Sequence, residues 1–303
     1  MSGTVDVYYK RSSDLLFFGP LAAGSGLGNE DFYNVGTFDS KGIELAVNTV
    51  LLRNENLSWN LNFNATYNRT EVVNTTRGGA AGAGTPQVAG SAGFDAVQYY
   101  APGFALNTYW VYKQKLDDSG KPFTSSGNTN EELLKAFEDL NKDGKIDSND
   151  RYYAQQAAPK YILGLTSNLT AGRAYFNFTL RSYLGNYNYN NVSAGLNTYN
   201  NLYAATGNYF SNTTPLLGNA VNFVSRQSFS DYYVQKADFV RCENATVGYN
   251  FPKLGGDESR NLGVSFTVQN AFVLSSYKDL DPEVATGIDN NAYPRARAYT
   301  VGL

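Results

Sequence analysis

Alternation of apolar and polar residues along the chain predicts extended strands with one apolar face. In residues 58–67, "SWNLNFNATY", every second residue is polar, and the apolar positions between them are Trp59, Leu61, Phe63, Ala65 and Tyr67. Such a period of two is typical of a β-strand with one buried face. The same alternation recurs in 174–182, 243–251 and 261–270, and we expect further strands near 3–11, 40–53, 160–171 and 294–303.

The polar faces of these strands carry little charge. They consist mainly of Asn, Thr, Ser and Gly, with few Lys or Glu. A soluble sheet usually presents many charges to water, whereas a lipid-embedded barrel pairs an apolar outer face with a polar lumen. The pattern therefore favours an all-β fold, an antiparallel transmembrane β-barrel. A secreted β-sandwich that binds glycans stays open as an alternative.

Long and short connections alternate between these strands. Because neighbouring strands run antiparallel, all long loops then lie at one end of the sheet, provided that each contains an even number of extra strands. Outer-membrane barrels have long extracellular loops and short periplasmic turns in this arrangement. Eight strands also permit a free-standing small eight-stranded outer-membrane barrel. The long connections cover 12–39, 71–159, 186–234 and 274–293, and the tight turns lie at 53–57, 170–173 and 252–260.

Composition narrows the chemistry that the chain can perform. It has 24 Tyr and 18 Phe, a formal net charge of −3 and no cluster of basic residues, so we expect no nucleic-acid binding. It has no His and a single Cys, Cys242, which removes the commonest general base and any internal disulfide. We expect no enzyme. No apolar run of about 18 residues predicts a transmembrane helix, and Met1 does not begin a signal peptide.

Residues 139–150, "DLNKDGKIDSND", have the spacing of an oxygen-ligand calcium loop. Gly144 permits the sharp turn, and Ile146 is the apolar anchor. Just before the loop, Leu133, Leu134 and Phe137 share one face of a short predicted helix with Leu140, and no comparable helix follows. We expect a structural Ca²⁺ site, with a solvated acidic turn as the alternative. The predicted ligands are Asp139, Asn141, Asp143, the Lys145 carbonyl, Asp147 and Asp150.

Two further segments of the long connections have compositions that can form binding sites. Residues 77–93 are rich in Gly and Ala but lack the Lys-Ser/Thr ending of a phosphate-binding loop, so no cofactor is expected there. Residues 185–210 interleave Tyr with Asn, and aromatic faces beside amide groups can hold sugars or peptides. An ordinary turn-rich loop explains this segment equally well. The weak substrate-binding candidates are Tyr187, Tyr189, Tyr199 and Tyr203.

Several segments, in order along the chain, resemble one known family. They include the acidic loop followed by Pro159-Lys160-Tyr161, the strand end Gly248-Tyr249-Asn250-Phe251-Pro252, and Asp281-Pro282-Glu283 before Tyr293-Pro294-Arg295. Together with 40–49, they resemble the C-terminal part of SusC-type TonB-dependent outer-membrane transporters. The resemblance implies that residues 1–303 form the C-terminal portion of a larger barrel of about 22 strands. The plug domain and the N-terminal strands have no counterpart here.

The resemblance also implies a function and partners. A family member sits in the cell outer membrane, in contact with its lipid, and imports oligosaccharides or peptides without breaking a bond in them. A SusD-like surface lipoprotein closes over the cargo. The TonB complex supplies energy through the N-terminal part that this sequence lacks.

Overall fold

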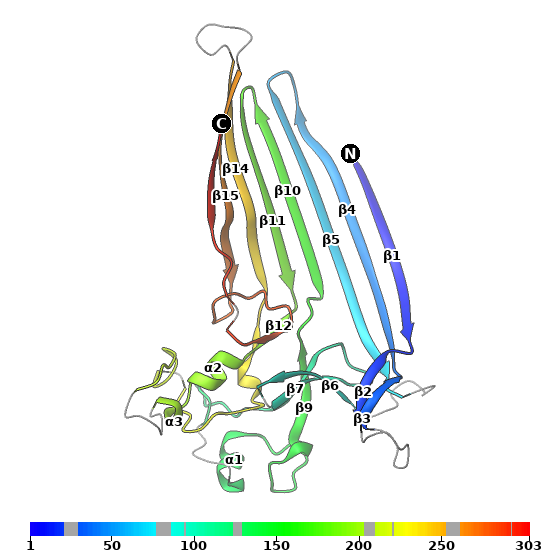
Figure 1. The fold of residues 1–303 in the computed structure, drawn as a ribbon, viewed down its shortest axis with the longest axis vertical. Coiled ribbons are helices and arrows are strands. Elements are labelled where there is room, and N and C mark those ends of the chain that lie inside the picture. The colour runs from blue at the N-terminus through cyan, green and yellow to red at the C-terminus, as the bar shows by residue number, and fades with distance from the viewer. Residues whose placement is uncertain are drawn as a thin grey trace.

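A single antiparallel sheet of eight strands dominates the structure (Figure 1). The computed structural model describes residues 1–20, 30–76, 86–93, 95–123, 129–202, 210–219, 221–252, 261–291 and 293–303. All eight strands expected from the sequence are present, and each pairs with its neighbours in an antiparallel register. In spatial order they are β1 (Ser2–Ser13), β4 (Thr37–Arg53), β5 (Leu57–Asn74), β10 (Tyr161–Ala171), β11 (Ala174–Leu184), β14 (Phe239–Pro252), β15 (Asn261–Ser275) and β17 (Ala298–Gly302).

The long connections lie together beyond one end of this sheet (Figure 1). The first contains a hairpin of β2 (Leu16–Pro20) and β3 (Glu30–Asn34), and the second contains a four-stranded sheet. That sheet comprises β6 (Gln87–Ala92), β7 (Asp95–Tyr100), β8 (Thr108–Tyr112) and β9 (Arg151–Gln156). The remaining elements are β12 (Tyr187–Asn190), β13 (Val234–Lys236), β16 (Ile288–Asp289), the helices α1 (Asn130–Ala136), α2 (Asn191–Leu196) and α3 (Tyr199–Leu202), and the 3₁₀ turns η1 (Ser148–Asp150) and η2 (Asp231–Tyr233).

The expected alternation of loop lengths is confirmed, although one assumption behind it was wrong. Counted over the described residues, the connections that contain β2–β3, β6–β9 and β12–β13 each hold an even number of strands, as assumed. In its described part, the last connection holds one strand, β16, a two-residue strand that pairs in parallel with β12. Because β16 belongs to the loop sheet, β15 and β17 still pair antiparallel and the long loops stay at one end.

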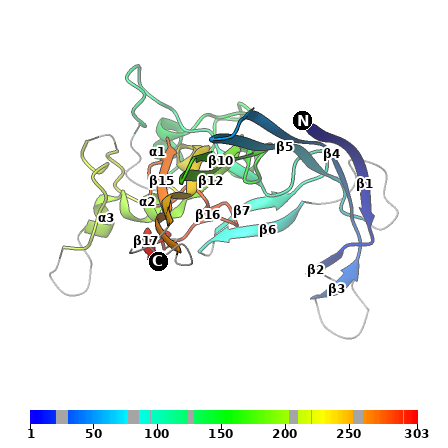
Figure 2. The same cartoon turned by 90° about the horizontal axis from the view of Figure 1, so that it is seen from above.

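The eight-stranded sheet is an open arc in the view along its strands (Figure 2). Among the described residues, β1 pairs only with β4 and β17 only with β15, so these two strands form opposite edges. This contradicts the free-standing eight-stranded barrel, which needs its edges to pair. It also contradicts the β-sandwich, because no second sheet of comparable size packs face to face with this one among the described residues.

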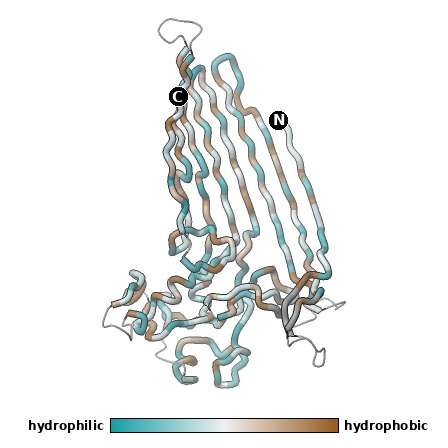
Figure 3. Tube along the Cα trace, in the orientation of Figure 1, coloured by the Kyte–Doolittle hydropathy of each residue, from teal (hydrophilic) through white to brown (hydrophobic). Residues whose placement is uncertain are grey.

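Apolar and polar residues alternate along each strand (Figure 3). The register aligns them across the strands into continuous rows, apolar on one face of the sheet and polar on the other. Side chains directly opposite one another in a sheet share a face. One apolar row crosses seven strands through Leu52, Trp59, Leu169, Phe176, Val247, Phe266 and Val301. A polar row on the other face runs through Asn60, Asn168, Asn177, Thr246, Thr267 and Thr300.

The apolar face has the height of a lipid bilayer core. On β5 it runs from Leu57 to Tyr67, which is about 34 Å along the strand at about 3.4 Å per residue, or about 26 Å along the membrane normal at a typical strand tilt of about 40°. The apolar band of an outer-membrane barrel is about 25 Å tall. The next residues on this face, Arg69 and Glu71, form an ion pair, and they mark the edge of the band at the loop end. Among the described residues, no helix is long and apolar enough to cross a membrane.

Candidate functional site

The long connections after β5, β11 and β15 pack into one shared core at the loop end of the sheet. Its aromatic centre lies against aliphatic residues of β7 and β8, so segments far apart in the sequence support one another. Burial of this apolar surface gives the loops a defined shape. The fully buried members include Val97, Tyr109, Val111, Tyr189, Val221, Phe223 and Tyr233.

Tyr109 ties three connections together. Its hydroxyl oxygen lies 2.6 Å from the Gly287 carbonyl oxygen and 2.8 Å from the Tyr187 carbonyl oxygen, so its single proton is shared between these two acceptors. Burial raises the pKa of the Tyr109 phenol, which therefore stays a hydrogen-bond donor at neutral pH. Gly287 has a φ of 75°, and a Cβ there would lie 2.3 Å from Cβ of Ala157. Only glycine fits this junction.

Among the described residues of 185–210, the tyrosines do not form one stacking surface. Tyr189 is fully buried, and its ring centre lies 6.4 Å from that of Tyr233. Burial raises the pKa of Tyr189 to about 12. Tyr187 packs partly exposed beside the core, and Tyr199 donates from its hydroxyl to Asn222 Oδ1 at 3.1 Å. Tyr203 lies outside the described residues. Their role in substrate binding stays a prediction.

An open cavity of about 750 Å³ lies next to Tyr199, and asparagines line much of it. The one charged side chain among its described lining residues is Arg226, which donates to Asn191 Oδ1 at 2.5 Å. Amide side chains both donate and accept hydrogen bonds, so this surface suits neutral polar ligands. Its asparagines are Asn191, Asn200, Asn201, Asn290 and Asn291.

The acidic loop folds around its first aspartate. The Asp139 carboxylate accepts from the backbone N–H groups of Lys142, Asp143 and Gly144 at 2.6, 3.2 and 2.8 Å. Gly144 has a φ of 80°, which explains the glycine in the motif. The side chain of Asn130, the first residue of α1, donates to the Gly144 carbonyl and accepts from the Ile146 N–H. The helix therefore holds the loop from outside.

The apolar anchor of the loop is confirmed, but the helix before it ends early. Ile146 is buried against Phe137 and Ala136, with Leu133 and Leu134 packed beside them. The helix stops at Ala136, so Leu140 is not on it as predicted, and its side chain is exposed. After the loop only the short turn η1 follows, in agreement with the sequence.

The last aspartate of the loop is fully buried. Asp150 accepts from the N–H groups of Leu140 and Asn141 at one oxygen, and from that of Asp147 at the other. Within the described parts of the chain, no three Asp, Glu, His or Cys side chains converge closely enough for a metal cage. The turn and the all-oxygen donor set fit Ca²⁺, whereas the mutual spacing of the carboxylates does not show a formed cage. The calcium site stays a prediction.

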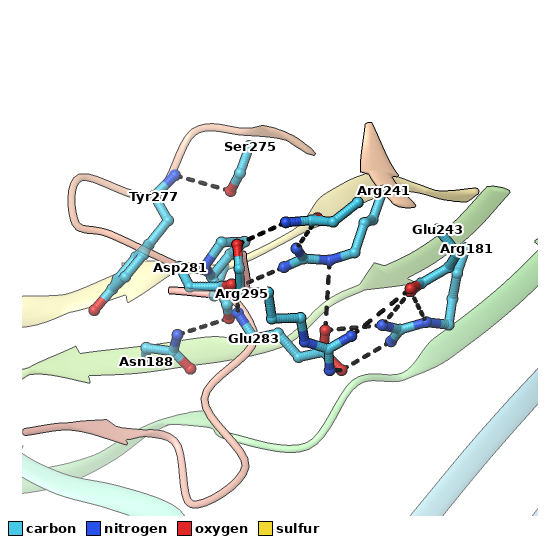
Figure 4. A network of polar contacts seen from close by, with 12 residues as sticks. Arg181, Asn188, Arg241, Glu243, Ser275, Tyr277, Asp281, Glu283 and Arg295 are labelled. Atoms are coloured by element: carbon cyan, nitrogen blue, oxygen red, sulfur yellow. Dashed lines mark hydrogen bonds and ion pairs between the residues drawn. The ribbon is translucent and has the colours of Figure 1, made fainter. Parts of the chain in front are cut away.

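A network of charges that the sequence analysis did not assign fixes the connection after β15 to the polar face of the sheet (Figure 4). Arg241 of β14 is 1% exposed and donates to Asp281 Oδ1 at 2.6 Å and to Asn270 Oδ1 at 2.8 Å. Glu283 accepts from Arg181 of β11 at 2.8 and 3.0 Å, and it pairs with Arg295 at 3.0 Å.

This network explains two of the motifs that carry the family resemblance. Asp281 and Glu283 come from one motif and Arg295 from the other, while Arg181, Arg241 and Glu243 come from the strands. A signal was present in the sequence, because Arg181, Arg241 and Glu243 are the charged residues of two strands, β11 and β14, that are otherwise uncharged. The network holds residues 281–283 against the polar face of the sheet.

An open antiparallel sheet with an apolar face of bilayer height, a polar opposite face and long loops at one end is the wall of an outer-membrane β-barrel. No family model matches the sequence. The chain is, however, 33% identical over 313 residues to the TonB-dependent receptor SusC of Bacteroides thetaiotaomicron, an alignment that covers 100% of the chain and 30% of that receptor. The chain is therefore homologous to SusC-type TonB-dependent receptors of the outer membrane.

Further comparisons agree. TonB-dependent receptor P3 of Formosa agariphila is 26% identical over 321 residues, covering 98% of the chain and 31% of that receptor. The solved structure of the RagAB peptide transporter superposes with a TM-score of 0.72 at 17% identity, over 99% of the chain and 32% of the solved one, which shows the shared fold. The chain spans about a third of the length of the curated relatives it matches. By name these relatives are receptors, not enzymes.

Proposed function

We propose that the chain forms part of the barrel wall of a TonB-dependent importer that carries nutrient across the outer membrane. The homology over the whole chain carries this proposal. Within the complete protein, these residues would be the C-terminal portion of the barrel. A plug domain encoded outside them would couple it to the TonB complex.

The loop end of the sheet is the proposed docking face for a SusD-like lipoprotein, and the polar face below it is the proposed wall of the cargo path. The shared aromatic core supports this, because a loop that is already ordered avoids about 0.5–1.5 kcal/mol for each side chain that binding would otherwise immobilise. The asparagine-lined cavity supports a neutral polar cargo, either an oligosaccharide or a peptide.

Uptake by cells that carry the full-length protein tests the proposal. Labelled oligosaccharides and peptides are offered in parallel, with and without a functional TonB complex, and the outer-membrane protein is isolated with its partners. We expect accumulation of one cargo class only with TonB, and a surface lipoprotein that co-purifies in stoichiometric amount. Equal uptake without TonB would contradict energised import, and isolation without a lipoprotein would contradict the lid.

We propose separately that residues 139–150 bind Ca²⁺ as a structural site. Asp139, Asn141, Asp143, the Lys145 carbonyl and Asp150 would hold the ion, with Asp147 contributing as in related loops. The turn at Gly144 and the buried Asp150 carboxylate support this proposal.

Protease resistance of the 116–159 region in the full-length protein tests the calcium proposal. Added Ca²⁺ should slow cleavage there, and Asp143→Ala should abolish the effect. Asp118→Ala is a matched control, because Asp118 is an exposed acidic residue in the same connection but outside the loop. Protection that Asp143→Ala leaves unchanged would contradict the proposal, as would an equal loss in the control.

A further inference from the structure

A cavity of about 320 Å³ opens on the apolar side of the sheet, where the lipid-facing band ends. Tyr67 and Arg69 of β5 and Tyr161 of β10 line the part of the cavity nearest the sheet. Tyr67 and Arg69 continue the alternate positions of the apolar face, and Tyr161 lies opposite Tyr67 in the register. The two tyrosine rings lie 5.2 Å apart. These three residues place the sheet side of the cavity on the lipid-facing side of the barrel wall.

The wall of the cavity on the loop side comes from the long connection after β5. Beyond Tyr161, where β10 begins, residues 103–106 take the place of β10 beside β5: Gly103 N–H donates to the Val72 carbonyl at 2.8 Å, and Leu106 N–H donates to the Thr70 carbonyl at 3.3 Å. Phe104 packs on Tyr153 at 4.4 Å between ring centres. This segment of the connection therefore lies next to the aromatic edge of the lipid-facing band, on its loop side.

Positive charge gathers at this level. Arg69 and Lys160 line the cavity, and Lys41 lies opposite Arg69 in the register, on the same face. Glu71 and Asp39 neutralise part of this charge, since Glu71 pairs with Arg69 at 3.0 Å and Asp39, opposite Glu71 on the same face, pairs with Arg11 at 2.7 Å. Within the described residues, Lys41 and Lys160 have no ion-pair partner. This local excess of cations stands out in a chain whose net charge is −3.

We propose that this cavity binds the phosphorylated headgroup of an outer-leaflet lipid. Tyrosine side chains favour the membrane–water interface, which here coincides with the rim of the apolar face. Arginine and lysine on the loop side of that rim lie at the depth of a lipid phosphate. Arginine can bind a phosphate through two parallel hydrogen bonds. The acyl chains of the lipid would cover the rings of Tyr67 and Tyr161. The site is independent of the cargo path on the opposite face.

Native mass spectrometry of the full-length protein in detergent tests the site. The probes are lipid A carrying phosphate, the same lipid A after removal of its phosphates, and inorganic phosphate. We expect the phosphorylated lipid to bind at least tenfold more tightly than the dephosphorylated one, as two cations near an anionic headgroup imply. Inorganic phosphate at millimolar concentration should not displace it; displacement would assign the site to a free anion instead of a lipid.

Charge variants provide the controls. The double variant Arg69→Gln, Lys160→Gln should lose the preference for the phosphorylated lipid, whereas Arg69→Lys, Lys160→Arg should keep most of it. Lys121→Gln removes an exposed cation elsewhere in the loops and should change nothing. Heat-modified migration on gels checks that each barrel is folded. The proposal is overturned if folded double variant and wild type share the same preference, or if neither has one.

Discussion

The connection after β15 should loosen when Asp281 is replaced by alanine. Arg241, 1% exposed, would lose the carboxylate that accepts from it at 2.6 Å. Asp281 also accepts from the Glu283 N–H at 2.9 Å, so the turn that carries Glu283 would lose a second bond. The guanidinium would keep Asn270 at 2.8 Å and Glu283 at 3.6 Å.

The size of the effect follows from this partial compensation. Removing one partner of a buried ion pair typically costs about 3–5 kcal/mol, because the remaining charge is left without its counter-ion. Glu283 is close enough to offset part of that cost, so we expect about 3 kcal/mol. Because about 1.4 kcal/mol corresponds to a factor of ten, the open state of the connection should become about a hundredfold more populated.

Amide hydrogen exchange in the full-length protein measures this opening. The Tyr189 N–H donates to the Gly287 carbonyl at 2.7 Å, so its protection reports whether the connection is closed. Asp281→Ala should speed its exchange about a hundredfold, and Asp281→Asn, which keeps an acceptor, should do so less. Lys236→Gln removes an exposed ion pair nearby and should change little. Less than a tenfold increase for Asp281→Ala would refute the reasoning.

Two further predictions concern the shared loop core. Gly287→Ala should expose the Tyr189 amide to exchange and cost about 1–3 kcal/mol, because the new Cβ meets Ala157 and the φ is positive; unchanged protection would contradict this. Burial raises the pKa of Asp231, so its neutral form favours the folded core and that contribution is lost as pH rises through the raised pKa. Protection of the Gln114 amide, which donates to Asp231, should therefore increase as the pH falls from 7 towards 4, but not in Asp231→Asn. Equal pH dependence in both would contradict it.

The strand pattern was enough to predict the sheet, because each face is specified by every second residue. In 58–67 the alternation fixes which residues face lipid, and a slip of one position would exchange the two faces. The loop end could also be predicted, since it follows from the parity of antiparallel strands. These are local or counting arguments, and they need no knowledge of distant contacts.

The loop core and the charge network could not be predicted in this way. Tyr189 was a candidate for ligand contact, yet it is fully buried, because β12 packs between segments about 80 and 100 residues away in sequence. Alternation says nothing about such long-range packing. The pairing of Arg241 with Asp281 likewise depends on how the connection folds back onto the strand. A charge on an uncharged face signals an unseen partner without identifying it.

Topology in intact cells tests the central claim most directly. Full-length protein with Cys242 replaced receives a single cysteine, by Asp118→Cys in a long connection or by Glu55→Cys in the tight turn between β4 and β5. A membrane-impermeant thiol reagent should label the first in intact cells and the second only after the outer membrane is permeabilised. Labelling of Glu55→Cys but not of Asp118→Cys in intact cells would contradict a barrel wall with its long loops outside.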